Sequence, residues 1–307
     1  MKLKHFLEIV LLGCLWSPSF LFIKLAVNEI PPFTMVTIRV CLALLFLIPL
    51  LKITGRQLPR GSKTWGHFFV LGFFSLALPF FLFAIAEQNI ASSLAGIING
   101  STPIFTALLA HRLIVGDKLT LSRTLGVLLG FTGLLVLLAP TLLDGTAEGD
   151  TWGMCAAVTA ALSYAIGHIY AKRFLGNFPP LVAPTCQMIG AFVILLPFAL
   201  LIDSPQNLPM PSGKAIGALA GLSFLGTFCA FILYFRVLKH SGPTNLSMAA
   251  YLFPLLSTIL GVIFLNEVLG MHTYIAGGFI LLGMMTVNGI IKLPLFRKKK
   301  TATQAGL

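Results

Sequence analysis

The chain has 307 residues, of which 57% are hydrophobic and 10% are charged, and its mean hydropathy is +0.95. A soluble globular domain carries roughly 25% charged residues, so this composition excludes an ordinary soluble enzyme, a disordered protein and a nucleic-acid-binding domain. The net charge of +12 then fits the Lys and Arg residues that enrich the cytoplasmic loops of membrane proteins. The sequence therefore predicts an all-α integral membrane protein, because only lipid can solvate so much apolar surface.

Ten apolar segments follow one another along the chain, and a transmembrane helix needs about 20 apolar residues. Proline, glycine or charged residues separate them, as at Pro31-Pro32 and in the acidic loop from Asp144 to Asp150. The remaining length allows short loops but no folded soluble domain. The predicted spans are 6–27, 33–51, 65–86, 91–111, 121–140, 152–172, 181–202, 215–235, 244–265 and 273–292.

The distribution of basic residues predicts how these spans are oriented. With the N-terminus in the cytoplasm, alternate loops and both tails hold 18 of the 21 Lys and Arg residues, and the remaining three are Lys24, Arg39 and Lys214. The positive-inside rule therefore predicts that both termini are cytoplasmic. The basic tail, residues 293–307, is expected to be attracted to anionic lipid at the membrane surface.

The sequence repeats itself at close to half its length. Each half holds five predicted spans, and an odd number inserts the second half upside down relative to the first. We therefore expect two inverted five-helix repeats, residues 1–148 and 149–292, which can exchange conformations in alternating access around a midplane site. The corresponding residues, 148 to 151 positions apart, include Trp16 and Tyr164, Lys24 and Lys172, Pro31-Pro32 and Pro179-Pro180, and Pro103 and Pro254.

Several short motifs occur in a fixed order along residues 6–292. They are Leu15-Trp16-Ser17 with Lys24, Pro31-Pro32 with Ile38-Arg39, Pro103, Gly116-Asp117-Lys118-Leu119-Thr120, Ala161-Leu162-Ser163-Tyr164-Ala165, Pro254, and Leu265-Asn266-Glu267-Val268-Leu269. Their order, spacing and duplication resemble the drug/metabolite transporter superfamily, specifically its proteins with paired EamA repeats. Asp117 stands where that family usually has Glu. The resemblance implies a ten-helix carrier that exports or exchanges small metabolites, amino acids, drugs or nucleotide-linked sugars.

Three proline-containing stretches are predicted to line a substrate cavity. A proline within a helix leaves a backbone carbonyl without its donor, and transporters expose such backbone to substrate. Hydrogen bonding between helices is the alternative role for the hydroxyl residues there. The candidate binding residues are Trp16 and Ser17 before Pro18, Asn99 before Pro103, and Tyr251 before Pro254.

Ionisable and aromatic side chains within the spans complete the candidate binding site. Arg39 lies about six residues into the second span, where it either lines a cavity or snorkels to the outer interface. Tyr164 and His168 are four residues apart and share a helix face, so both can line one wall, although a lone His is as often a packed residue. Phe80 can stack on a flat substrate or face lipid.

Other charged residues have structural interpretations. Lys24, near the outer end of the first span, is expected to snorkel. Glu8, one turn into that span, is expected to pair with a basic residue, with proton coupling as the alternative. Asp117 and Glu267 lie at span ends, where we expect them to cap helix termini or pair with helix dipoles.

Glycines four residues apart predict close packing between helices. They are Gly126 with Gly130 in the fifth span, and Gly213, Gly217 and Gly221 leading into the eighth. Packing within the monomer is the expected role, and a homodimer is the alternative. The other expected partners are a small-molecule substrate and membrane lipid, and no nucleic acid is expected.

No motif of a serine hydrolase, zinc protease or P-loop ATPase occurs, and the five cysteines form no CxxC pair. We therefore expect no catalytic residue, metal or cofactor. The sequence favours a multi-pass secondary transporter of the plasma membrane, the inner membrane of a bacterium, that exports small organic solutes such as amino acids, related metabolites or drugs. The alternatives are an importer or exchanger of nucleotide-linked or other metabolites, a membrane-embedded lipid-modifying enzyme, and a non-transporting scaffold.

Overall fold

The computed structural model describes residues 3–114, 119–144, 148–175 and 178–291, and within these ranges every regular element is a helix. The elements of the first half are α1 Leu3–Trp16, α2 Pro18–Val27, α3 Pro32–Ile53, α4 Ser62–Gly72, η1 Phe73–Ala77, α5 Leu78–Asn89, α6 Ser92–Asn99, α7 Thr102–Leu113 and α8 Leu121–Asp144. Those of the second half are α9 Glu148–Tyr170, η2 Ala171–Leu175, α10 Val182–Phe198, η3 Ala199–Asp203, η4 Pro205–Asn207, α11 Gly213–Ser223, η5 Phe224–Cys229, α12 Ala230–Leu246, η6 Ser247–Tyr251, α13 Leu252–Leu265 and α14 Met271–Val287.

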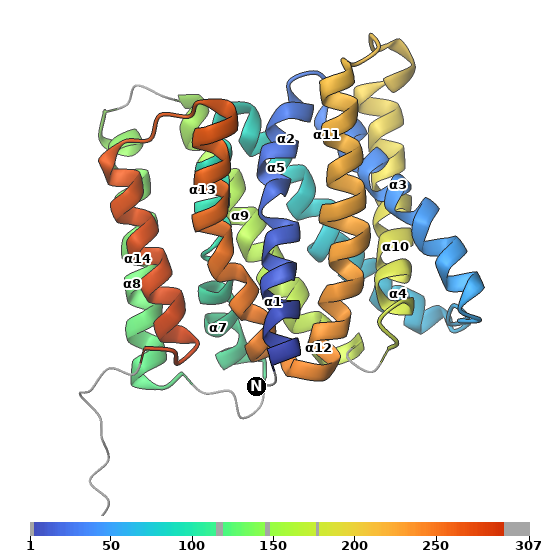
Figure 1. Cartoon of the computed structure of the whole chain (residues 1–307), viewed down its shortest axis with the longest axis horizontal. Helices are drawn as coiled ribbons and strands as arrows, with labels where there is room; N and C mark the ends of the chain where they lie inside the picture. The colour runs from blue at the N-terminus through green and yellow to red at the C-terminus, as the bar shows by residue number, and fades with distance from the viewer. Residues whose placement is uncertain (1–2, 115–118, 145–147, 176–177, 292–307) are drawn as a thin grey trace, which may run out of the picture.

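The helices stand side by side in one layered bundle (Figure 1). Two shorter apolar helices, at 249–265 and 271–287, follow eight longer ones. The predicted ninth and tenth segments need correction, because α12 continues to Leu246 before the 3₁₀ turn η6, and α14 ends at Val287. Within the described residues, the eight stretches long and apolar enough to cross a membrane are Leu3–Val27, Pro32–Ile53, Ser62–Asn89, Ser92–Leu113, Leu121–Pro140, Thr151–Leu175, Val182–Asp203 and Gly213–His240.

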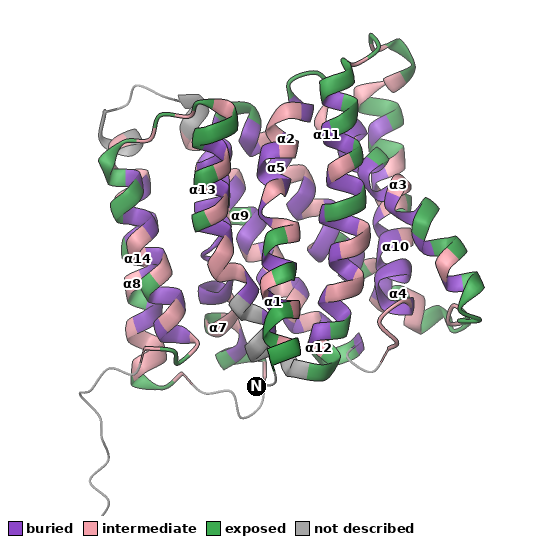
Figure 2. Ribbon diagram, viewed as in Figure 1, coloured by how far each residue is buried: buried purple, intermediate pink, exposed green. Residues whose placement is uncertain are grey.

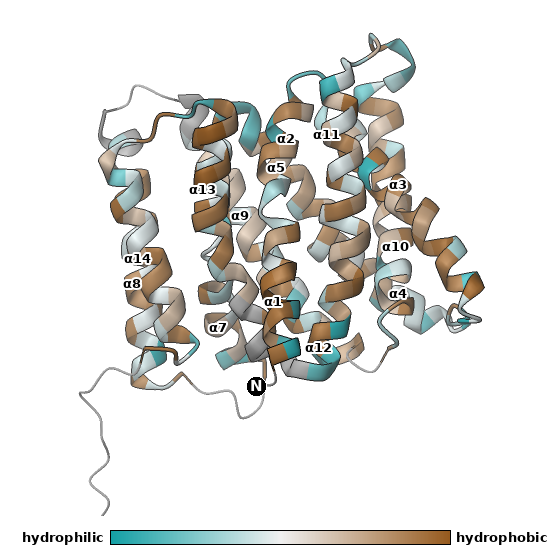
Figure 3. Cartoon of the chain, in the orientation of Figure 1, coloured by the Kyte–Doolittle hydropathy of each residue, from teal (hydrophilic) through white to brown (hydrophobic). Residues whose placement is uncertain are grey.

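The outer surface of the bundle is apolar. Large hydrophobic side chains such as Leu45, Leu135 and Phe264 are more than 60% exposed, and hydrophobic positions run along the outward-facing sides of the helices (Figures 2 and 3). A soluble monomer rarely exposes apolar patches of this extent. Lipid is therefore the solvent for this surface, as the composition predicts.

Each of the three predicted proline kinks is a break in helical geometry. Helix α1 gives way to α2 at Ser17, α6 gives way to α7 at Gly100 and Ser101, and the 3₁₀ segment η6 precedes Pro254. Two π-helical segments, η1 and η5, begin 151 residues apart. This irregularity therefore recurs at the same position of both halves, whereas the π-helical segments η2 and η3 belong to the second half alone among the described residues.

Helices α8 and α14 pack against each other at one edge of the bundle (Figure 1) through glycines. A Cβ atom added to Gly126 would lie 2.7 Å from the Gly283 carbonyl oxygen, and one added to Gly283 would lie 2.6 Å from the Gly130 nitrogen. The glycines of the fifth span therefore pack within the monomer. The prediction for the eighth span is wrong at Gly213 and Gly217, since a Cβ on either would meet nothing within 4 Å.

Candidate functional site

A cavity of about 250 Å³ lies between the two halves of the chain. At the end of the bundle where α1 begins, here called the N-terminal face, its wall includes Ile114, Arg123 and Lys172 at helix ends. Toward the other end, here called the opposite face, the wall stops at Ile23 and Phe83. Among the described residues, the cavity wall therefore reaches helix ends at the N-terminal face and stops short of the opposite face.

Corresponding positions of the two halves build the cavity wall. Among the paired positions, the two halves differ in charge at Arg39, whose counterpart Gln187 is neutral. The wall is therefore symmetric in the positions that line it but not in the chemistry of their side chains. The pairs that line it are Trp16 and Tyr164, Phe20 and His168, and Arg39 and Gln187, each 148 residues apart, and Phe80 and Phe231, Phe83 and Tyr234, and Thr102 and Phe253, each 151 apart.

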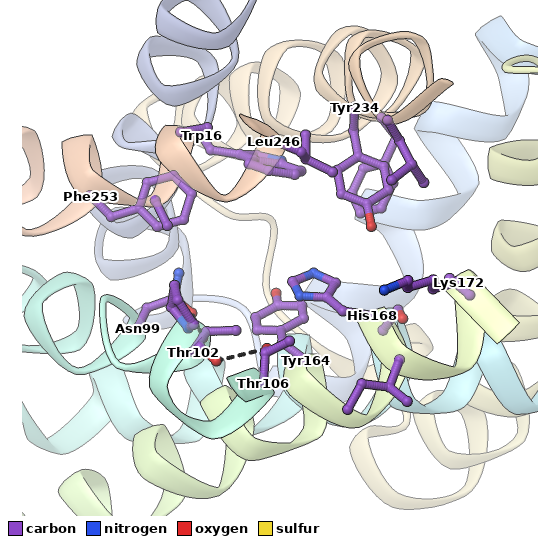
Figure 4. A pocket seen from close by; sticks show the side chains of 18 of the residues that line it. Trp16, Asn99, Thr102, Thr106, Tyr164, His168, Lys172, Tyr234, Leu246 and Phe253 are labelled. Carbon is purple, nitrogen blue, oxygen red and sulfur yellow. Dashed lines mark hydrogen bonds between the residues drawn. The ribbon is translucent and has the colours of Figure 1, made fainter. Parts of the chain in front are cut away.

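Aromatic rings form most of the middle of this wall. Tyr164 lies 6.1 Å from Phe83 between ring centroids, and His168 stacks between Tyr164 at 6.4 Å and Tyr234 at 6.1 Å. Trp16 packs edge to face on Phe253 at 5.9 Å. Across the cavity in Figure 4, Trp16, Tyr234 and Phe253 face Asn99, Tyr164 and His168. Such rings offer flat apolar surface with a few polar atoms that can fix a solute's orientation.

Arg39 supplies a buried cation at the edge of this aromatic group. Its side chain is 3% exposed, so it does not snorkel. The Nε atom donates to Thr227 Oγ1 at 2.8 Å, and the guanidinium carbon lies 3.5 Å from the Phe80 ring centroid. Among the described residues, no carboxylate lies within ion-pair distance of Arg39. The remaining guanidinium donors can therefore bind an anionic group of a solute.

The structure places six of the eight predicted binding residues in the cavity wall: Trp16, Arg39, Phe80, Asn99, Tyr164 and His168. It places the other two elsewhere. Ser17 is buried at the α1–α2 break, where its hydroxyl donates to the Gly13 carbonyl oxygen at 2.7 Å. The Tyr251 hydroxyl accepts a hydrogen bond from Asn288 Nδ2 at 2.7 Å.

Sequence reasoning missed several wall residues, most clearly Phe231 and Tyr234 on α12. The repeat contained the signal that could have found them. Applying the 151-residue separation of Pro103 and Pro254 to Phe80 and Phe83 leads to these two positions.

Two charged residues near the N-terminus form polar contacts within the protein. The expected snorkelling of Lys24 is wrong, because its Nζ donates to the main-chain oxygens of Glu87 at 2.5 Å and Ile90 at 2.9 Å. The expected pairing of Glu8 is confirmed, with Arg236 Nε at 3.3 Å. Lys24 therefore binds the C-terminal carbonyls of α5, where a cation is favoured by the helix dipole.

Three acidic side chains join the two halves at the opposite face by capping helix N-termini. Glu29 accepts from the Ser212 amide at 2.6 Å before α11, and Asp203 accepts from the Thr34 amide at 2.7 Å in α3. Glu267 accepts from two amides at the start of α6, at 2.7 and 3.0 Å, which confirms its expected capping role. The Ser212 amide, with the Ser212 hydroxyl second, lowers the pKa of Glu29. Asp117, the other predicted cap, lies outside the described residues.

Within the described residues, no three His, Cys, Asp or Glu side chains are placed to hold a metal ion. Long apolar helices, a lipid-compatible surface and a solute-sized cavity together define a multi-pass membrane protein built to hold a small molecule. The EamA-like transporter family model matches the chain twice, over residues 5–139 and 151–289. The chain belongs to this family, and it is a membrane transporter of the drug/metabolite transporter type.

Similar proteins carry transporter names. The "Uncharacterized inner membrane transporter YedA" of Escherichia coli (strain K12) is 25% identical over 89% of this chain and 87% of its own length. An "Uncharacterized transporter" of Archaeoglobus fulgidus is 24% identical over 93% of this chain and 99% of its own. A solved crystal structure aligns with a TM-score of 0.66 at 20% identity, covering 94% of this chain and 98% of that one, and supports the fold.

Proposed function

We propose that this protein is a secondary transporter that exports small organic solutes, amino acids or related metabolites among them, across the bacterial plasma membrane by alternating access. The observation that carries the proposal is the cavity between the two halves, lined by paired positions of both and closed at one face only. Two inverted repeats that exchange conformations would close the N-terminal face and open the other.

The distribution of charge supports ten membrane-spanning helices with both termini in the cytoplasm, since 18 of the 21 Lys and Arg residues then lie on cytoplasmic loops and tails. In that orientation the N-terminal face is cytoplasmic. The structure then corresponds to the state that takes up solute from the cell before export.

The chemistry of the wall favours a solute with a carboxylate and an apolar or aromatic body. Arg39 has guanidinium donors for the carboxylate, and Trp16, Tyr164 and Phe231 surround the space beside it. No Asp or Glu belongs to the described wall, so nothing there repels an anionic group. A volume of about 250 Å³ lies just below the range of about 300–1,000 Å³ typical of ligand pockets, which fits a small metabolite.

Counterflow into proteoliposomes preloaded with pools of amino acids and related metabolites tests this function. Arg39→Ala removes charged hydrogen bonds of about 1.5–3 kcal/mol, which predicts at least a tenfold weaker apparent affinity. Tyr164→Ala removes the ring at the centre of the aromatic wall and is expected to reduce flux as well. The matched controls are Arg56→Ala and Tyr274→Ala, at exposed positions outside the cavity.

Loss of counterflow in both cavity variants, with normal flux in both controls, would support the proposal. Equal flux in all four variants would contradict the assigned cavity, and the absence of flux from every pool would contradict the proposed solute class. Reversing the solute gradient separates export from the alternatives of import or exchange.

A further inference from the structure

Glu87 is a buried carboxyl group that the solute cavity does not explain. It lies near the end of α5, one turn beyond Phe83, which closes the cavity at that end. Its side chain is 0% exposed, and neither carboxylate oxygen has a hydrogen-bond partner. The three capping acids of the opposite face, Glu29, Asp203 and Glu267, all accept from backbone amides.

The cations near Glu87 direct their donors elsewhere. Lys24, on α2, binds the main-chain oxygens of Glu87 and Ile90 rather than the carboxyl group. Arg39, on α3, donates from Nε to Thr227. The fields of Lys24 and Arg39, with a smaller contribution from the Lys24 backbone amide, favour the carboxylate, and the field of the nearby Glu267 carboxylate opposes them.

Segments η1 and α6, which also pack against α5, contain no titratable side chain. On α9, Tyr164 and His168 line the cavity, and Cys155 is exposed. Glu148 and Asp150 also belong to α9, in its first turn, and their side chains lie outside the described part of the chain. An ionised carboxylate with no donor, buried inside a membrane protein, is costly enough that the group takes up a proton instead.

The repeat has no acid at the position that corresponds to Glu87. The residue that corresponds to Glu87, 151 positions later, is Leu238 on α12. An apolar side chain therefore occupies the equivalent position in the second half. Glu87 adds a titratable group to one face only.

We propose that Glu87 is a proton-binding site that controls opening of the opposite face, in a transporter that works by the alternating access proposed above. In the closed state the carboxyl group is neutral and buried. When the face opens, water reaches it, the O–H bond breaks, and the proton passes to that water. Closing reverses the step, with one proton taken from the same side.

The direction of the pH effect follows from this linkage. Because the closed state binds one more proton than the open state, acid at the opposite face favours closure. Export through an outward-facing step then slows as external pH falls. A proton-antiport cycle predicts the reverse, since external acid would drive export.

Cysteine labelling tests the site without any solute. Ile90→Cys places a thiol beside Glu87 at the closed face, where Ile90 is 3% exposed. A membrane-impermeant thiol reagent is added at the opposite face, and the protein that retains Ile90 gives the background from native cysteines. The labelling rate of Ile90→Cys is measured in a protein that retains Glu87 and in one that also carries Glu87→Gln, which mimics the neutral acid. The ratio of the two rates cancels the pH dependence of thiol chemistry.

The ratio of the rate with Glu87 to the rate with Glu87→Gln is expected to be near one in acid and to rise by up to tenfold per pH unit between about pH 5.5 and 8.5. Glu8→Gln, which removes an ion-paired carboxylate at the N-terminal face, should leave this rise unchanged. A constant ratio would overturn the proposal, as would a ratio that follows sodium concentration at fixed pH.

Faster labelling of Glu87→Gln than of the parent would also overturn it, because the acid would then hold the face closed as an ionised partner of Lys24. Failure of the counterflow experiment would contradict the proposed solute class and leave the labelling result intact. The two failures are therefore distinguishable.

Discussion

Substitution of Gly283 by alanine tests whether α8 and α14 form a fixed pair within the monomer. The added Cβ would lie 2.6 Å from the Gly130 nitrogen, 2.7 Å from the Gly126 carbonyl oxygen and 2.9 Å from the Gly130 Cα. All three are backbone atoms, so no side-chain rotation relieves the overlap. The two helices must instead separate until these contacts reach the ordinary range of 3.4 Å or more.

The expected cost is the difference between two opposing effects. Overpacking a tight contact costs about 1–3 kcal/mol, while replacing a helical glycine by alanine gains roughly 0.5–1 kcal/mol. Gly283→Ala should therefore be destabilising by up to about 2.5 kcal/mol, and by about 1 kcal/mol at the middle of both ranges. Gly278 lies on the same helix, and a Cβ added to it would meet nothing within 4 Å. Gly278→Ala should therefore gain the roughly 0.5–1 kcal/mol of helix stability without the cost of overpacking.

The measurement is the temperature at which half of the purified protein loses its monodisperse elution peak in detergent. Gly283→Ala is expected to lower this midpoint by about 2–6 °C, and Gly278→Ala is expected to raise it or leave it unchanged. A midpoint for Gly283→Ala at or above that of the parent would refute the reasoning. So would an equal fall in both variants.

Three further substitutions have expected outcomes in the same thermal assay. Glu267→Ala removes the acceptor for the amides at the start of α6, so the midpoint should fall by the equivalent of about 1 kcal/mol, and an unchanged midpoint would argue against a cap. Because the pKa of Glu29 is lowered from 4.5, its stabilisation is present above that pH and lost as pH falls through the lowered value; the midpoint difference between parent and Glu29→Gln should be constant near neutral pH and vanish in acid. Trp16→Phe leaves the Gly226 carbonyl without its 3.1 Å donor and should cost about 1 kcal/mol, whereas Trp152→Phe, at a position 75% exposed, should cost little.

Local sequence was sufficient to predict the first eight apolar spans and the three helix breaks next to prolines. The spans could be predicted because a helix surrounded by lipid must itself be apolar. The breaks could be predicted because a proline such as Pro18 or Pro103 disrupts backbone hydrogen bonds only within its own turn. Arg39 could be assigned to a cavity or the interface from its depth in the span. Only the structure shows that Thr227, 188 residues away, holds it inside.

Long-range partners could not be predicted from one sequence. Lys24 binds main-chain oxygens 63 and 66 residues away, and main-chain acceptors leave no mark in the side-chain pattern. Ser17 and Tyr251 lie beside predicted breaks, but the rotation of the helix about each break directs their side chains away from the cavity. The repeat was informative about Phe231 and Tyr234 because corresponding positions of the halves share a wall.

Lys24 and Lys172 are corresponding residues in different environments. Lys24 holds two carbonyls at the closed face, whereas Lys172 lines the mouth of the cavity at the open one (Figure 4). If the second half adopted the geometry of the first, Lys172 would reach the main-chain oxygens at positions 238 and 241. A carrier with identical halves would spend equal time open to each side. If the protein works by the proposed alternating access, any preference for one side must therefore be encoded where the halves differ, as at Arg39 with Gln187 and at Glu87 with Leu238.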